Sequence, residues 1–268
     1  MSSTAKTAAR SSRNSSTLHA LALSGFAVNG AVNAVIGLIA IGIAVSGGGS
    51  ADQSGAFSAI AANPGGLVGL WVAAVALAAL GIWYLFESFF VTEQETKKRV
   101  AAIVVSAGKG IAYLVLASAA FGFATGGGGD SSQQSTSFTA TLMASPGGVI
   151  LVVVIGLVVC GIGAYMVHKG ATRGFEDDLV MPTGTTAKAV RGLGMFGYIA
   201  RGIALFIVGV LFIVAAFTVD PEKATGLDGA LKALAALPFG QVILVLVGLG
   251  FIAYGAYSVA RARLARLG

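Results

Sequence analysis

Six long apolar stretches constrain the fold of this chain more than any other feature of its sequence. Each holds about 20 or more mostly apolar residues, the length that an α-helix needs to cross the hydrocarbon core of a bilayer. Charged residues make up only 10% of the chain, against about 25% in soluble domains. We therefore predict an all-α, polytopic membrane protein. Its six transmembrane helices are expected over Ala20–Ser46, Gly65–Phe90, Val100–Thr125, Gly147–Val167, Leu193–Val219 and Phe239–Ala260.

Basic residues gather in four of the segments that flank these stretches. Thirteen Lys and Arg residues lie in the N-terminal tail, the second and fourth connections and the C-terminus, whereas the other three connections hold only Lys223 and Lys232. Because basic segments remain on the cytoplasmic side, both termini are predicted to be cytoplasmic. The net charge of +6 follows this topology and forms no single stripe, so no nucleic-acid partner is expected.

Three proline segments repeat along the chain, each just before an even-numbered predicted helix. Proline suits the first turn of a helix, where its missing N–H costs nothing, so each proline is expected to open its helix. A glycine stands seventeen residues after each proline, and a residue pair ending in glycine recurs in the odd-numbered helices. The repeated positions are Pro64, Pro146 and Pro238; Gly81, Gly163 and Gly255; and Asn29-Gly30, Lys109-Gly110 and Arg201-Gly202.

This internal repeat predicts three tandem two-helix hairpins in a pseudo-threefold arrangement. Residues 20–95, 96–175 and 193–262 are expected to form the hairpins, with a cytoplasmic linker over 176–192 and cytoplasmic tails over 1–19, expected to be disordered, and 263–268. A short segment before each proline has apolar residues on one helical face, as in Ala230, Leu231 and Leu234. We expect these segments to be amphipathic helices on the outer surface; the alternative is that they plug or gate a central opening.

Three segments carry a resemblance to a known family: Ala200-Arg201-Gly202, the stretch from Asp220-Pro221 through Gly226-Leu227-Asp228-Gly229 to Pro238-Phe239-Gly240, and Phe175-Glu176-Asp177-Asp178-Leu179. In these segments the chain resembles the domain of unknown function 1206 family of uncharacterised bacterial membrane proteins. The resemblance covers residues from about 20 to 262 and implies an integral protein of the bacterial plasma membrane with six helices. It implies no known activity.

Asn29, Lys109 and Arg201 occupy one position of the three repeats and are the most informative candidates for a site. A charge at the centre of a bilayer costs about 2.5–3.5 kcal/mol, which makes intramembrane ionisable groups functional suspects. Eighteen residues separate Arg201 from Asp220, or about 27 Å of helix, so Arg201 lies near the cytoplasmic interface. These residues are either interface anchors that extend toward water or a cationic site for lipid head groups or an anionic solute. Glu87, near the same interface, is expected to pair with Lys109 or Arg201 or to be a solvated helix end.

The sequence offers two kinds of function. No catalytic triad, phosphate-binding loop or metal-ligand spacing occurs, and there is one cysteine and two histidines; we therefore expect no enzyme, cofactor or metal. The first hypothesis is a membrane scaffold or accessory protein that binds anionic phospholipid, another membrane protein or a second copy. The alternative is a transporter or channel for a small solute along the pseudo-threefold axis. Apolar helix centres favour the scaffold, because transporters place polar groups at the midplane.

Overall fold

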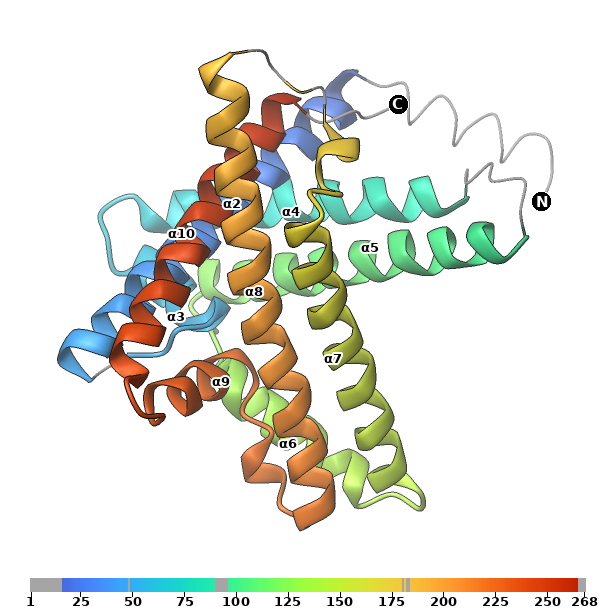
Figure 1. Cartoon of the computed structure of the whole chain (residues 1–268), viewed down its shortest axis with the longest axis vertical. Helices are drawn as coiled ribbons and strands as arrows, with labels where there is room; N and C mark the ends of the chain where they lie inside the picture. Colours follow the sequence, from blue (N-terminus) through green and yellow to red (C-terminus); the bar gives the residue numbers. More distant parts are fainter. Residues whose placement is uncertain (1–15, 48, 90–95, 180, 182–183, 265–268) are drawn as a thin grey trace.

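The computed structural model describes residues 16–47, 49–89, 96–179, 181 and 184–264. Six helices in this part of the chain are long and apolar enough to cross a membrane, which confirms the helical membrane bundle expected from the sequence (Figure 1). The six long helices are α2 (Ser16–Ser46), α4 (Gly66–Phe89), α5 (Thr96–Ala124), α7 (Gly148–Ala171), α8 (Thr185–Thr218) and α10 (Gly240–Leu264). Shorter elements join them: α3 (Gln53–Ala61), α6 (Ser131–Met143), η1 (Glu176–Asp178), η2 (Pro221–Lys223) and α9 (Gly226–Ala235).

Several predicted boundaries need correction. Helix α2 already begins at Ser16 and α10 continues to Leu264, so each helix takes residues assigned to a tail. Residues 1–15 and 265–268 of those tails, and residues 90–95 at the end of the first hairpin, lie outside the described residues. Helix α8 begins at Thr185, inside the predicted linker. The reason is tertiary: Val190 on this first part of α8 is buried together with Phe175 and Leu179, which lie between α7 and α8.

Each proline lies in a tight turn that precedes an even-numbered predicted helix, and the helix begins two residues later. The backbone N–H of the second residue after each proline donates a hydrogen bond to the carbonyl oxygen of the residue just before the proline, at 2.7–2.9 Å. The residue after the proline is left-handed: Gly65, Gly147 and Phe239 have φ of 78°, 77° and 60°. Proline followed by a positive φ is the pattern of a type II turn. The proline is therefore the second residue of the turn before the helix, and the expectation that it opens the helix is wrong. The left-handed residue that follows it cannot belong to the helix itself.

The closest helix pairs join successive repeats. Repeat 1 comprises α2 and α4, repeat 2 α5 and α7, and repeat 3 α8 and α10. The most extensive contacts are between α4 and α5, α7 and α8, and α10 and α2. This cycle from repeat 1 to 2, 2 to 3 and 3 to 1 is the one a pseudo-threefold arrangement requires. The hairpin is thus the unit of the sequence repeat, while the tight packing lies between hairpins.

Glycines at the repeated positions make these three close pairs possible. Gly81 faces Gly110, Gly163 faces Gly202 and Gly255 faces Gly30: a Cβ atom added to any of them would lie only 2.6–2.9 Å from the carbonyl oxygen of its partner. Small residues allow such close backbone approach between membrane helices, where packing replaces the hydrophobic driving force. A second contact follows seven residues along in two of the pairs, where Gly156 meets Gly209 and Gly248 meets Gly37.

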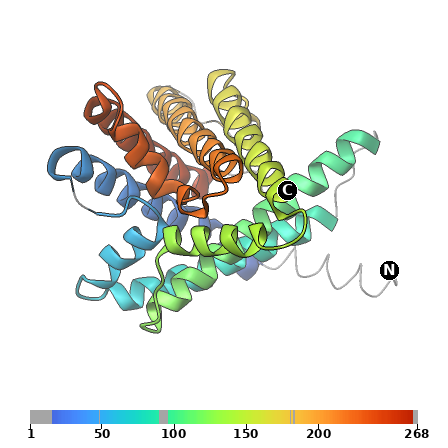
Figure 2. The same cartoon turned by 90° about the horizontal axis from the view of Figure 1, so that it is seen from below.

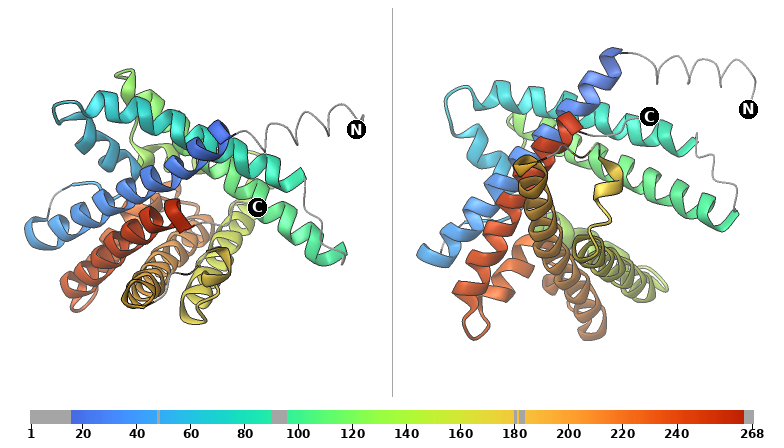
Figure 3. Two further views of the ribbon diagram at one scale, coloured as in Figure 1. Left: turned by 90° about the horizontal axis from the view of Figure 1, so that it is seen from above. Right: turned by 45° about the horizontal axis from the view of Figure 1, so that its top comes forward.

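The ring of helices is open at one place, between α5 and α7. Within repeats 1 and 3 the two long helices also touch, α2 with α4 and α8 with α10, but among the described residues α5 and α7 form no comparable contact. Only 11% of the most apolar window of α5 and 17% of that of α7 are buried, against 39–56% in the other four long helices. Figures 2 and 3 show α10 between α2 and α8, with α7 and α5 at the two margins of the row. We call this opening the α5/α7 seam.

The three short helices gather at the end of the bundle opposite Ser16 and Leu264, which we call the short-helix end. The Asp228 carboxylate of α9 accepts a hydrogen bond from the Ala51 N–H of repeat 1 at 2.9 Å. The Ser54 hydroxyl of α3 accepts one from the Ser131 N–H of repeat 2 at 3.2 Å. Helix α6 in turn packs on α9 and η2. These bonds and contacts link all three repeats at this end.

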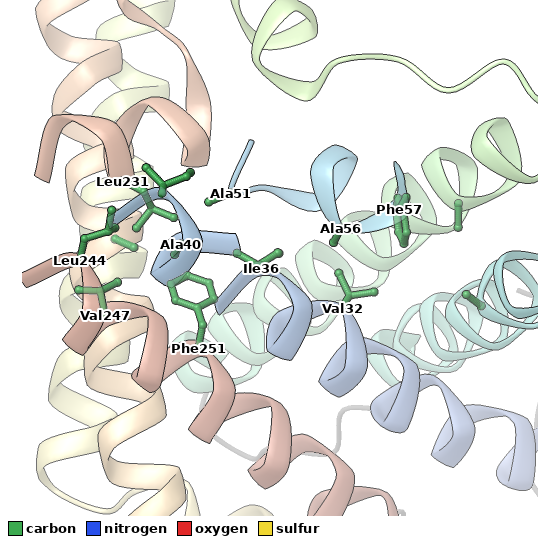
Figure 4. Packing of buried hydrophobic residues seen from close by; sticks show 14 of the residues in the cluster. Val32, Ile36, Ala40, Ala51, Ala56, Phe57, Leu231, Leu244, Val247 and Phe251 are labelled. Atoms are coloured by element: carbon green, nitrogen blue, oxygen red, sulfur yellow. The ribbon is translucent and has the colours of Figure 1, made fainter. Parts of the chain in front are cut away.

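An apolar core lies beneath the short helices. Figure 4 shows Phe251 of α10 beside Ile36 and Ala40 of α2, with Leu231 of α9 in the same cluster. All four side chains are buried. The segments before the prolines are therefore helices, as expected. In α9 the buried face is the apolar face of an amphipathic helix.

Candidate anion-binding site

Three cationic side chains lie over aromatic rings near the end of the bundle that carries Ser16 and Leu264. The Lys109 Nζ of α5 is 5.3 Å from the centre of the Tyr84 ring of α4. The Arg201 guanidinium of α8 is 4.6 Å from the Tyr254 ring of α10. Cations within about 6 Å of a ring centre are attracted by the electrons of its face. The rings thus hold both charged groups against neighbouring helices of the bundle.

Arg261 of α10 completes this set. Its guanidinium is 4.7 Å from the centre of the buried Phe26 ring of α2. Its Nη2 also lies 3.5 Å from the Tyr84 hydroxyl, at the limit of a hydrogen bond. Lys109 and Arg261 thus both contact Tyr84, and Arg261 lies on the same helix as Tyr254, which Arg201 contacts. We call Lys109, Arg201 and Arg261, with Tyr84 and Tyr254, the basic-aromatic cluster.

Further tyrosines support the cluster. Tyr113 of α5 stacks on Tyr84, with ring centres 5.7 Å apart and planes within 6°. Tyr198 of α8 meets Tyr254 edge to face at 5.3 Å and stacks on Phe175 of the α7–α8 connection at 5.4 Å. Rigid rings that pack on one another hold the cationic groups in place with little loss of side-chain freedom. Arg201 is half-buried and Lys109 is exposed, so the cluster is open to a ligand.

Lys109 and Arg201 each lie over a tyrosine ring, whereas Asn29 is buried and bonds within its own helix. Asn29 is 2% exposed, and its described side-chain hydrogen bond is with Asn33, one turn further along α2, at 3.2 Å. Asn33 also donates to the Asn29 carbonyl at 2.7 Å. The Asn29 side-chain amide therefore forms its hydrogen bond within α2. The third cationic group of the cluster is Arg261.

Glu87 lies at the same end, on the exposed side of α4. Its carboxylate accepts a hydrogen bond from the Ser106 hydroxyl of α5 at 3.3 Å, which links these two helices. A pairing of Glu87 with Lys109 or Arg201 stays a prediction.

Arg261 was expected only as one of the basic residues of the C-terminus and was missed as a site residue. One signal was available: Arg261 stands six residues after Gly255, and Phe26 four residues before Gly30. Because Gly255 and Gly30 are in contact, the two side chains must project from the same crossing. This signal can be interpreted only when it is known that α10 packs against α2, and the spacing of residues along the chain does not reveal which helices pack together.

The α7–α8 connection folds back onto the bundle next to the cluster. Phe175 and Leu179 are buried, and the Glu176 carboxylate accepts two hydrogen bonds from Arg191 of α8, at 2.7 and 2.9 Å. Glu176, which lies in the predicted cytoplasmic linker, is therefore bound to α8. The hydrogen bonds from Arg191 lower the pKa of the Glu176 carboxyl.

This ion pair predicts a pH dependence of stability. A carboxyl group whose pKa is lowered by folding stabilises the protein above its unfolded pKa, about 4.3, and the contribution is lost as the pH falls through the folded pKa. At pH 7 we expect Glu176→Gln to lower the midpoint of thermal unfolding by up to about 3 °C. The difference from wild type should shrink as the pH falls through the lowered pKa of Glu176.

Unfolding followed in detergent between pH 3 and pH 8 measures the effect. Asp177→Asn, at the exposed neighbouring position, is the matched control and should leave the midpoint unchanged throughout. A Glu176→Gln effect of equal size at pH 3 and pH 7 would contradict the electrostatic origin.

Comparison with known proteins agrees with this architecture. The family described as Domain of Unknown Function (DUF1206) matches three times, over residues 24–90, 104–173 and 196–265, one match for each repeat. The chain is also 30% identical over 240 residues to the Bacillus subtilis (strain 168) protein named "Uncharacterized protein YxxB", which covers 88% of this chain and 86% of that protein. No solved structure matches the chain significantly. The protein therefore belongs to the DUF1206 family, with three copies of the family repeat.

Proposed function

We propose that this protein is a non-enzymatic scaffold or accessory protein of the membrane that holds an anionic lipid phosphate in the basic-aromatic cluster. The contacts of Lys109 and Arg261 with Tyr84, and of Arg201 with Tyr254, carry the proposal. Cationic groups that gather on neighbouring rings attract an anion. A guanidinium can bind two phosphate oxygens at once, and the Lys109 ammonium adds a point charge.

The distribution of basic residues supports a lipid as the source of the phosphate. By the positive-inside rule the end with the cluster faces the cytoplasm, which places the cationic groups at the cytoplasmic leaflet. That leaflet carries the anionic lipids whose surface potential attracts basic side chains.

Packing at the short-helix end supports binding over conduction. A channel or transporter along the axis needs polar groups at the midplane. Here the core between the helices is formed by side chains such as Ile36, Leu77 and Phe251, and the linked short helices lie over it. These observations favour a bundle that holds a ligand at one end.

Lipid retention after mild extraction tests the proposal. We expect Arg201→Ala to reduce the fraction of protein that retains phosphatidylglycerol by about 10-fold or more, since a hydrogen-bonded charge contributes about 1.5–3 kcal/mol. Arg201→Lys should cause a smaller loss, because an ammonium cannot make the bidentate contact. Native mass spectrometry of the purified variants measures both.

The control is Lys188→Ala, which removes one charge from an exposed position on the same helix and should leave retention unchanged. If wild type and Arg201→Ala retain equal phosphatidylglycerol, the lipid-binding proposal is wrong. A silent Arg201→Lys together with a silent Arg201→Ala would leave only the interface-anchor interpretation.

A further inference from the structure

The α5/α7 seam has a cause that can be traced to single residues. In repeat 1, a Cβ atom on Gly25 of α2 would lie 2.6 Å from the Ala76 carbonyl oxygen and from the Leu80 Cβ of α4. In repeat 3, a Cβ atom on Gly197 of α8 would lie 2.6 Å from the Tyr254 backbone of α10. A glycine thus lets the two long helices of each of these repeats meet.

Repeat 2 has branched side chains at the matching positions. Val105 stands five residues before Gly110, as Gly25 and Gly197 stand before Gly30 and Gly202. Val158 and Ile162 stand twelve and sixteen residues after Pro146; the matching residues are Ala76 and Leu80 in repeat 1 and Gly250 and Tyr254 in repeat 3. A branched side chain keeps two helix backbones apart where glycine allows contact. Val105 in place of glycine, and Val158 in place of alanine or glycine, therefore favour an open ring at repeat 2.

The side chains along the seam form an apolar face that ends at the basic-aromatic cluster. Val105, Val158 and Ile162 are 51%, 55% and 47% exposed. Lys109 follows Val105 by four residues, so both lie on the same face of α5. An apolar face on two helices that leads to a cationic cluster matches a molecule with hydrocarbon chains and an anionic head group.

We propose that the α5/α7 seam is the lateral entrance and acyl-chain site of a diacyl anionic phospholipid whose phosphate binds Lys109 and Arg201. This inference rests on the proposed function and adds the route and the specificity of the same site. The lipid enters from the bilayer between α5 and α7, its chains lie along the α7 face that includes Val158, and its phosphate reaches the cluster. The linked short helices limit the seam at the other end.

Site-specific photocrosslinking tests the seam. The full-length protein carries benzoylphenylalanine in place of Val158, or in place of Val75 of α4 as control, and is placed in nanodiscs of phosphatidylglycerol and phosphatidylcholine at equal mole fraction. Both positions are 55% exposed, but Val75 lies six residues before Gly81 on the side of α4 away from the interior. Position 158 should crosslink phosphatidylglycerol at least about five-fold more than phosphatidylcholine, given charge-assisted capture of the head group. Position 75 should label both equally.

Two further variants separate the seam from the cluster. Arg201→Ala should abolish the preference at position 158. Val158→Trp, a change at an exposed position, should fill the seam and lower phosphatidylglycerol retention in native mass spectrometry about as much as Arg201→Ala, with unchanged thermal unfolding.

Each other outcome has one meaning. If Arg201→Ala loses the lipid while position 158 shows no preference and Val158→Trp retains it, the seam inference is wrong and the proposed function stands. If Arg201→Ala retains the lipid, both are wrong. If benzoylphenylalanine at position 158 crosslinks two copies of the protein, the seam is an interface between protomers and the inference is overturned.

Discussion

Gly163→Ala is expected to destabilise the bundle strongly. Gly161→Ala, on the opposite face of the same helix, is expected to be harmless. A Cβ atom on Gly163 would lie 2.5 Å from the Phe206 backbone nitrogen and 2.8 Å from the Gly202 carbonyl oxygen, while a Cβ atom on Gly161 meets nothing within 4 Å. Backbone atoms cannot turn aside as a side chain can, so α7 and α8 must separate. We estimate a loss of about 3 kcal/mol, in the upper range for single substitutions.

For a protein of this size such a loss corresponds to a fall of roughly 6–12 °C in the unfolding midpoint. Thermal unfolding of the two purified variants in the same detergent measures it, with Gly161→Ala as the matched control. Gly202→Ala, on the facing helix, should reproduce the effect of Gly163→Ala. Equal midpoints for the position 161 and 163 variants would show that the close α7–α8 approach does not stabilise the fold.

The second large effect is expected at the start of α4. A Cβ atom on Gly66 would collide with the carbonyl oxygen of Ile60, at the end of the preceding short helix. Gly148 and Gly240 face the same collision with the backbone at Leu142 and at Ala235. The proline turn therefore folds the chain back so tightly that only glycine fits two residues after each proline.

We expect Gly66→Ala to lower the stability by at least about 2 kcal/mol, or roughly 4–8 °C in the midpoint. Gly69→Ala, in the first turn of the same helix, is the control, because a Cβ atom there would make an ordinary contact of 3.9 Å with the Ile60 side chain. Thermal unfolding again measures the difference. If Gly66→Ala unfolds at the same temperature as Gly69→Ala, the turn tolerates a side chain and the explanation of the repeated glycine fails.

The residues that could be identified in advance are those whose role is local. A helix that crosses a bilayer must satisfy its backbone hydrogen bonds within itself. Each membrane-spanning helix is therefore encoded by one continuous apolar stretch, from which it could be predicted. The proline motifs and the glycines spaced from them mark equal backbones in three repeats, and the family matches follow the same division. The turn geometry after Pro64, Pro146 and Pro238 was less accessible, because proline fits both a first helical turn and a type II turn.

What the sequence by itself determined is therefore the set of parts: six membrane helices, three repeats, and the small-residue positions where helices can come close. The tertiary structure decided which part meets which. Gly81 could have faced a glycine of its own hairpin, but the structure pairs it with Gly110 of the next repeat. That choice carries Arg261 to Phe26 and leaves the seam open in repeat 2. The physical reason is that a glycine marks a face where a backbone can approach but does not specify the partner, which depends on how all six helices pack together.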